Sequence, residues 1–112
     1  MTTPKWISKP NGLSGRALSI WLGLAPAARE RGELTANNCD LFRGMCRALA
    51  VADVAQEAIE RDGVANKSTS GAWRANPAVK IMFDAQREAE RLAKELGLDG
   101  AKRLAKAFGL DG

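Results

Sequence analysis

Two cysteines are the residues in this sequence whose type and spacing most directly suggest chemistry. Cys39 and Cys46 are seven positions apart, and the chain contains no histidine. On a helix this spacing places both thiols on one face, about 10 Å apart, which is too far for a disulfide within that helix. With no histidine and no second cysteine pair, a zinc site is not predicted. We expect reduced, partly buried thiols and no metal or cofactor.

The sequence also lacks the residue patterns of common catalytic sites. Without histidine the usual nucleophile–base pair cannot be assembled, and the chain has neither a GxxxxGK[ST] phosphate loop nor a dinucleotide glycine fingerprint. A serine–lysine or paired-carboxylate site is open in principle, but Asp40, Asp53, Glu57 and Glu60 fall where a solvated helix face is expected. We therefore predict that the chain is not an enzyme. Any ATPase or nuclease activity of its system would belong to a partner.

Positive charge gathers at the two ends of the chain and in one internal segment. The formal net charge is +4; residues 1–33 carry five basic and two acidic side chains, and residues 34–63 carry three basic and five acidic ones. This is a mild electrostatic footprint for nucleic acid, and an ordinary solvated surface explains it equally well. The candidate DNA-binding residues are the cations of the ends and of segment 64–75: Lys5, Lys9, Arg16, Lys67, Arg74, Lys102, Arg103 and Lys106.

The elements that must position these residues begin with a basic arm over residues 1–12. The arm holds two of the four prolines together with Lys5 and Lys9, so we expect it to be flexible. Trp6 lies between these lysines. An aromatic side chain among cations can stack on a base or on a neighbouring subunit, or it can dock on the core of its own chain.

A helical domain is predicted over residues 13–97. Its first helix begins at Ser14, an N-cap residue, and ends before Gly32. Pro26 predicts either a kink or the start of a new turn within this helix.

Two longer helices are predicted in the rest of this domain. Apolar residues recur at spacings of three, four and seven over residues 36–61, after the cap residue Thr35. Asn76 followed by a proline begins a further helix over residues 77–96. A polar loop of about 12 residues joins the two, so they are expected to form an antiparallel helical hairpin. No strand is predicted.

Residues 98–112 are predicted to form a tail with a short C-terminal helix over about 100–108. The tail contains part of a short repeat, since LAKELGLDG at 92–100 recurs as LAKAFGLDG at 104–112. A period of 12 with only two copies cannot build a solenoid. The fold class is therefore all-α: an N-terminal helix, a long antiparallel hairpin and a short C-terminal helix.

The two long helices carry broader apolar faces than a lone hairpin can bury. The first helix can cover part of them, and the remainder is expected to meet another subunit. The candidate oligomerisation residues are large apolar side chains of the hairpin, each at least equally suited to the core of its own chain: Phe42, Met45, Leu49, Ile81, Met82 and Leu92.

Several short motifs occur in a characteristic order. They are Gly32-Glu33-Leu34-Thr35, then Asp40 and Cys46 in the long helix, Ile59 to Gly63 at its end, Asn76-Pro77 at the next helix start, and Glu95 to Leu98 at its close. In this order, over about residues 13–104, the chain resembles the small-subunit family of terminases from tailed double-stranded DNA phages. The family continues with Thr-Pro where this chain has Asp99-Gly100, and Arg103 is the nearest counterpart of the family's arginine.

The resemblance implies a non-catalytic homo-oligomeric ring that recognises the packaging-start sequence in viral double-stranded DNA. It also implies a partner, the large terminase subunit, which holds the ATPase and nuclease that the small subunit modulates. Such a protein works in the cytoplasm of the bacterial host, and no membrane partner is expected. A dimeric helical DNA-binding regulator and a protein-interaction adaptor that never touches DNA are the alternatives. A membrane-surface role for the basic tail ranks last.

Overall fold

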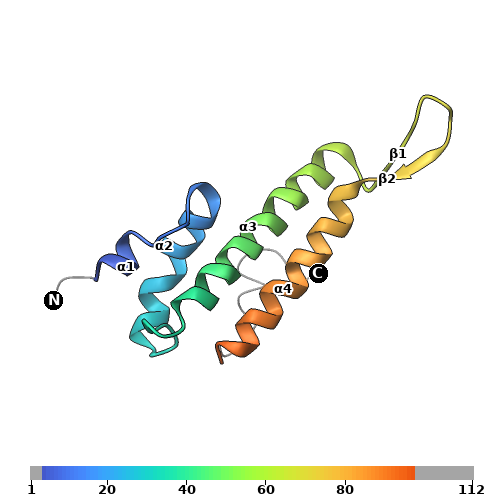
Figure 1. Cartoon of the computed structure of the whole chain (residues 1–112). Helices are drawn as coiled ribbons and strands as arrows, with labels where there is room; N and C mark the ends of the chain where they lie inside the picture. The colour runs from blue at the N-terminus through green and yellow to red at the C-terminus, as the bar shows by residue number, and fades with distance from the viewer. Residues whose placement is uncertain (1–3, 98–112) are drawn as a thin grey trace.

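The computed structural model of the chain describes residues 4–97, which form an elongated, mostly helical molecule measuring 62 × 25 × 19 Å. In chain order the described elements are α1 (Lys5–Ser8), α2 (Gly15–Glu30), α3 (Cys39–Asp62), β1 (Ala65–Lys67), β2 (Trp73–Ala75) and α4 (Pro77–Glu95). Helices α3 and α4 run antiparallel beside each other, α1 and α2 cover one end, and the two strands project from the other (Figure 1). The predicted helical hairpin is therefore confirmed.

Small residues bring α3 and α4 close together. Ala85, Ala89 and Ala93 of α4 are buried, and a Cβ added at Gly44 of α3 would lie only 3.3 Å from Leu92 Cδ1. Alanine and glycine shorten the distance between helix axes and leave few voids at the contact. The contact between α3 and α4 is accordingly the most extensive in the described fold.

The largest buried side chains of the core gather where α2 packs against α3. Trp21 and Phe42 are fully buried there, with ring centroids 5.4 Å apart in an edge-to-face arrangement. Trp21 Nε1 donates a hydrogen bond of 2.7 Å to the Ile7 carbonyl oxygen. This bond satisfies the indole N–H and fastens α1 to α2.

The segment predicted as a flexible arm contains a short helix that the sequence did not predict. Ile7 of α1 is buried, and Trp6 packs against the core as a partly buried side chain. Of the two roles considered for Trp6, docking on its own chain is therefore the one that the structure shows. A one-turn helix has little sequence signal, because its stability comes from tertiary contacts.

Helix boundaries follow the capping residues, with one correction. Helix α2 begins after Ser14 and continues through Pro26, and α4 begins at Pro77 after Asn76, whose Oδ1 accepts the Ala78 N–H at 3.0 Å. Helix α3 begins at Cys39, three residues later than the predicted start.

Asn38 accounts for the late start of α3. Its Oδ1 accepts the N–H of Thr35 at 2.8 Å, and its Nδ2 donates to the Glu33 carbonyl oxygen at 2.9 Å. These bonds hold residues 35–38 in a turn. A side chain that bonds to the nearby backbone competes in this way with helix formation.

The expectation that the fold contains no strand is wrong. Strands β1 and β2 pair antiparallel, with Asn66 opposite Arg74 and Lys67 opposite Trp73. The predicted C-terminal helix at about 100–108 lies outside the described residues.

Candidate nucleic-acid interface

The β1–β2 hairpin is closed by a short turn and anchored by one asparagine. The Ser68 N–H donates to the Ala72 carbonyl oxygen at 2.7 Å, and Gly71 has a φ of +86°, which favours glycine. At the base, Asn76 Nδ2 donates to the Gly63 carbonyl oxygen at 2.8 Å. Asn76 therefore caps α4 and ties the end of α3 to the hairpin with the same side chain.

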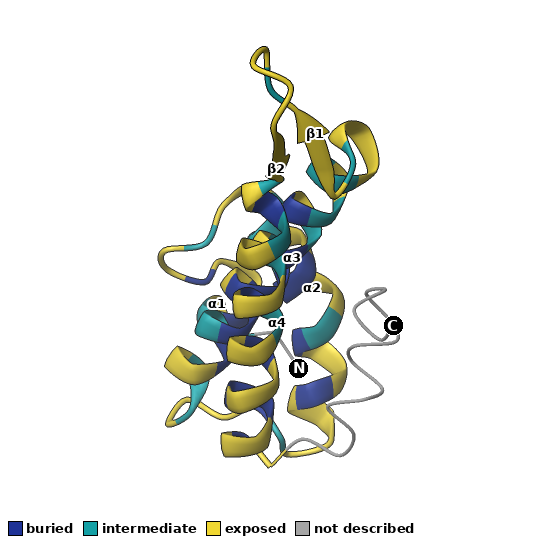
Figure 2. Ribbon diagram, turned by 90° about the vertical axis from the view of Figure 1, so that its right-hand side faces the viewer, coloured by how far each residue is buried: buried dark blue, intermediate teal, exposed yellow. Residues whose placement is uncertain are grey.

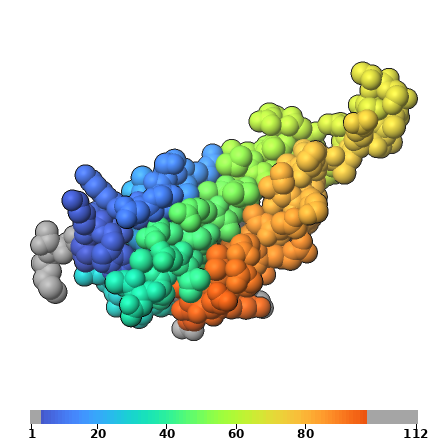
Figure 3. All heavy atoms as spheres, in the orientation of Figure 1, coloured from blue at the N-terminus to red at the C-terminus, as the bar shows by residue number. Residues whose placement is uncertain are grey.

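All six residues of the two strands are exposed. The hairpin stands clear of the helices as a narrow extension (Figure 3), and both of its strands are exposed while the helices bury one side (Figure 2). An isolated two-stranded hairpin is only marginally stable in water. Such an element makes little contribution to folding, which favours a role in binding.

The strand register gives the two faces of the hairpin different chemistry. Lys67 and Trp73 are cross-strand neighbours on one face, with Lys67 Nζ 5.7 Å from the ring centroid of Trp73. This is a cation–π contact, and the Trp73 side chain remains 68% exposed. Asn66 and Arg74 are opposite each other on the alternate face.

The hairpin and the first turns of α4 contain no acidic residue. Between Asp62 and Asp84 the sequence has three basic residues, Lys67, Arg74 and Lys80, and no aspartate or glutamate. The hairpin therefore carries positive charge that no carboxylate of its own segment offsets.

The two flanking carboxylates are each bound to a cation beside them. Arg61 Nη2 lies 2.9 Å from Asp62, and Lys80 Nζ lies 2.7 Å from Asp84, which Arg87 also contacts. The hydrogen bond from Arg61 lowers the pKa of Asp62, and hydrogen bonds from Lys80 and then Arg87 lower the pKa of Asp84. Both carboxylates are thus ionised and already paired at neutral pH.

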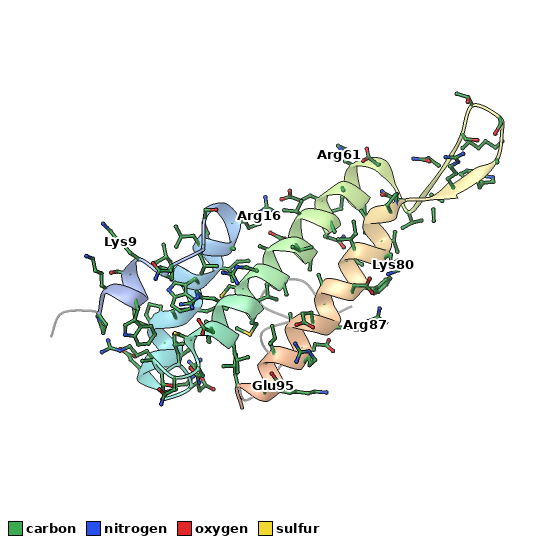
Figure 4. The ribbon with its side chains drawn as sticks, in the orientation of Figure 1. Lys9, Arg16, Arg61, Lys80, Arg87 and Glu95 are labelled. Carbon is green, nitrogen blue, oxygen red and sulfur yellow. The ribbon has the colours of Figure 1, made fainter. Side chains whose placement is uncertain are left out.

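The other predicted DNA-binding residues are not brought to the hairpin. Lys5 and Lys9 are exposed at α1, at the opposite end of the long axis, where Figure 4 shows Lys9. Arg16 Nη1 is bound to Asp53 at 2.9 Å and to Glu57 at 2.8 Å, so its charge is engaged within the chain. Lys102, Arg103 and Lys106 lie outside the described residues.

The predicted oligomerisation residues divide between core and surface. Phe42, Met45, Leu49 and Leu92 are buried within this chain, and Met82 is half-buried. Ile81 remains 48% exposed. Four of the six thus have almost no side-chain surface left for a second copy, and their part in assembly stays a prediction.

An apolar groove lies on the surface between the start of α2, the second half of α3 and the start of α4. Its volume is about 590 Å³, and Ala50, Val51, Val54, Ala58 and Ile81 are among its lining residues. The Val51 and Val54 side chains are 47% and 53% exposed. Val51, Val54 and Ala58 are three and four positions apart, which places them on one side of α3. This spacing was the sequence signal that could have predicted an apolar surface there.

The two cysteines differ in burial: Cys39 is half-buried and Cys46 is fully buried. Both are free, and burial raises the pKa of the Cys46 thiol to about 12. Residues 4–97 contain no group of three or more His, Cys, Asp or Glu side chains that could hold a metal ion. None of the described helices is long and apolar enough to cross a membrane.

The comparison with protein families identifies the group to which the chain belongs. The family model for phage terminase, small subunit, matches residues 17–109, which is most of the chain. The chain therefore belongs to the phage terminase small-subunit family and has a role in phage DNA packaging, as the order of its motifs predicts. No curated protein and no solved structure matches it.

Proposed function

We propose that this chain is the non-catalytic DNA-recognition subunit of its terminase. It assembles into a ring-like homo-oligomer in the host cytoplasm and binds viral double-stranded DNA. It then presents the DNA to the large subunit and regulates that subunit's ATPase and nuclease. Family membership supports the packaging role.

The observation that carries the DNA-binding part is the projecting, acid-free hairpin. Lys67 and Arg74 are exposed there beside an exposed Trp73, and the flanking carboxylates have their own partners. Basic side chains without a carboxylate partner attract the phosphate backbone of DNA. Basic side chains that are already paired with carboxylates contribute less to DNA binding. The hairpin is thus better suited to DNA than Arg16 is.

The groove supports assembly into a homo-oligomer. Exposed apolar surface that gathers in one place marks an interaction site more often than scattered apolar residues do. Ile81 lines the groove, while Phe83, 51% exposed, follows two positions later and so points to the opposite side of α4. Contacts between unlike surfaces of identical chains close into rings when the rotation permits.

The test of DNA binding uses the full chain and a labelled double-stranded DNA over a range of salt concentrations. Replacing Lys67 and Arg74 together by glutamine should weaken binding. It should also reduce the slope of log affinity against log salt by about 0.9 for each phosphate that the variant no longer neutralises. The matched control replaces Arg87 and Arg91 by glutamine, which removes the same charge from two arginines that are paired on α4.

The control variant should bind nearly as the original chain does, because its arginines are offset by neighbouring carboxylates. If both double variants lose DNA affinity equally, the net charge of the chain alone determines DNA binding, and the hairpin is not the binding element. No salt-dependent DNA binding by the original chain would contradict the function itself and favour the protein-interaction adaptor.

A further inference from the structure

We propose that the β1–β2 hairpin enters the major groove of duplex DNA and reads base edges through Asn66 and Arg74. This inference rests on the proposed function, because it assumes that the chain binds double-stranded DNA. It adds the binding element, the groove, the reading face and the bases that this face prefers.

The dimensions of the hairpin suit the major groove. That groove is about 12 Å wide and admits a two-stranded β-ribbon, whose strands lie about 4.8 Å apart. The hairpin projects beyond the helices, so both of its faces can be surrounded by another molecule (Figure 3). Ala65, Ala72 and Ala75 add little bulk beside the larger side chains.

The chemistry of one face matches base-edge recognition. Asn66 and Arg74 are cross-strand partners, so their Cβ atoms lie about 5 Å apart, a distance between one and two base-pair steps of about 3.4 Å each. Asparagine makes two hydrogen bonds with the adenine edge, and arginine makes two with the guanine edge. Both residues are exposed in the hairpin, and neither is among the side chains that form a hydrogen bond or ion pair within residues 4–97. Their donors and acceptors are therefore free for a base.

The opposite face has the chemistry of backbone contact. With Asn66 and Arg74 toward the floor of the groove, Lys67 and Trp73 face outward between the two walls of phosphates. Lys67 supplies a point charge for a phosphate, which carries no sequence information. Trp73 lies under Lys67 Nζ and offers a flat apolar surface to the sugar-phosphate wall. The two faces should therefore contribute separately to specificity and to general affinity.

The decisive variant is Arg74→Lys, which keeps the charge and removes the planar fork that binds guanine through two bonds. The probe is a pool of DNA duplexes with a randomised centre, selected by binding to the full-length chain and then sequenced. The original chain should enrich a motif with a guanine and a neighbouring adenine. Arg74→Lys should lower the preference for the guanine by about 5- to 150-fold, while the retained positive charge keeps duplexes without the motif bound.

Two further variants separate the roles of the faces. Asn66→Ala should abolish the preference for the adenine alone. Lys67→Gln should weaken binding to every sequence equally and lower the salt slope by about 0.9, with the motif intact. An RNA duplex should bind more weakly than DNA of the same sequence, because its deep, narrow major groove excludes the hairpin.

The outcomes distinguish this inference from the proposed function. Loss of base preference in Arg74→Lys or Asn66→Ala, with general binding retained, supports it. DNA binding without any enriched motif, or a motif that persists in both variants, overturns the reading role and leaves the DNA-binding function standing. Absence of binding to every duplex overturns both.

Discussion

Replacing Val54 by aspartate is expected to separate the subunits without unfolding them. Val54 lies in the groove on α3, and 53% of its side chain is exposed. Exposed substitutions usually change the free energy of unfolding by about 0.5 kcal/mol or less, and valine and aspartate have similar helix propensities. The fold of the single chain should therefore tolerate the change.

The effect on assembly follows from the apolar surface that the groove leaves exposed. Full burial of a valine or isoleucine side chain contributes about 1.5–3 kcal/mol. Val51, Val54 and Ile81 are each about half exposed, so covering them contributes about 1 kcal/mol apiece. Aspartate removes one of these contributions and adds a desolvation cost of several kcal/mol. Together these terms weaken the contact by about 1000-fold or more.

Solution mass by light scattering, over a range of protein concentrations and salt, measures this effect, and thermal unfolding checks the fold. The control is Leu22→Asp, which introduces the same charge at a side chain that is 47% exposed on α2 and outside the groove lining. Phe42→Ala should instead lower the thermal stability of the single chain. Phe42 is buried, and its replacement costs about 3–5 kcal/mol of folding free energy.

A folded Val54→Asp chain with the mass of the original oligomer would refute the assignment of the groove to assembly. Equal dissociation by Leu22→Asp would refute its specificity for the groove. If the original chain is a monomer or dimer at all concentrations, the ring is excluded, and a dimer that binds DNA would favour the regulator.

Four further predictions concern stability and reactivity. Trp21→Phe breaks the buried hydrogen bond to Ile7 and should lower the free energy of unfolding in urea by about 1–3 kcal/mol. Asn76→Ala removes the cap of α4 and should cost about 1 kcal/mol in the same assay. Burial favours the neutral Cys46 thiol in the folded chain. The stabilisation of the fold that results is complete below the ordinary thiol pKa of 9.0, and it is lost as the pH rises toward the folded-state pKa of about 12. Between these two pH values the free energy of unfolding should fall by about 1.4 kcal/mol per pH unit, and Cys46→Ser should remove this decline. At pH 8 a thiol reagent should modify Cys39 faster than Cys46.

The helices were predictable because their ends carry local signals. Asn76 and Pro77 determine the start of α4 within the chain itself, and the asparagine side chain bonds the second helical N–H. The start of α3 was misplaced because Thr35 and Asn38 are both good cap residues. Which of the two precedes the helix depends on the hydrogen bonds that Asn38 makes to Thr35 and Glu33. The residue types alone do not predict these bonds.

The β1–β2 hairpin was missed because it lacks the usual pattern of a strand. Its strands are three residues long and exposed on both faces, so no alternation of apolar and polar residues marks them. Their register is determined by the turn, which needs a positive φ at Gly71. A glycine-containing polar turn between two short segments was the signal that could have predicted the pairing.

The candidate site depends on packing between distant segments, which the sequence does not specify. Arg16 was a reasonable DNA-binding candidate by charge, but its partner Asp53 is 37 positions away and meets it only because α2 crosses α3. The same crossing determines which apolar side of α3 stays open. Phe42 is covered by α2, while Val54 lies in the groove between the start of α2 and the start of α4 and remains exposed.

Assembly and DNA binding should depend on each other. A single hairpin offers two cations, Lys67 and Arg74, and the electrostatic part of DNA binding grows with the number of phosphates that a protein neutralises. In a ring whose subunits stand along the symmetry axis, the hairpins, each at one end of a 62 Å long subunit, would gather on one rim. Several weak contacts on one DNA molecule then raise the affinity by about 100-fold or more without any new contact. We therefore expect Val54→Asp in the apolar groove to weaken DNA binding as well, although the groove is separate from the hairpin.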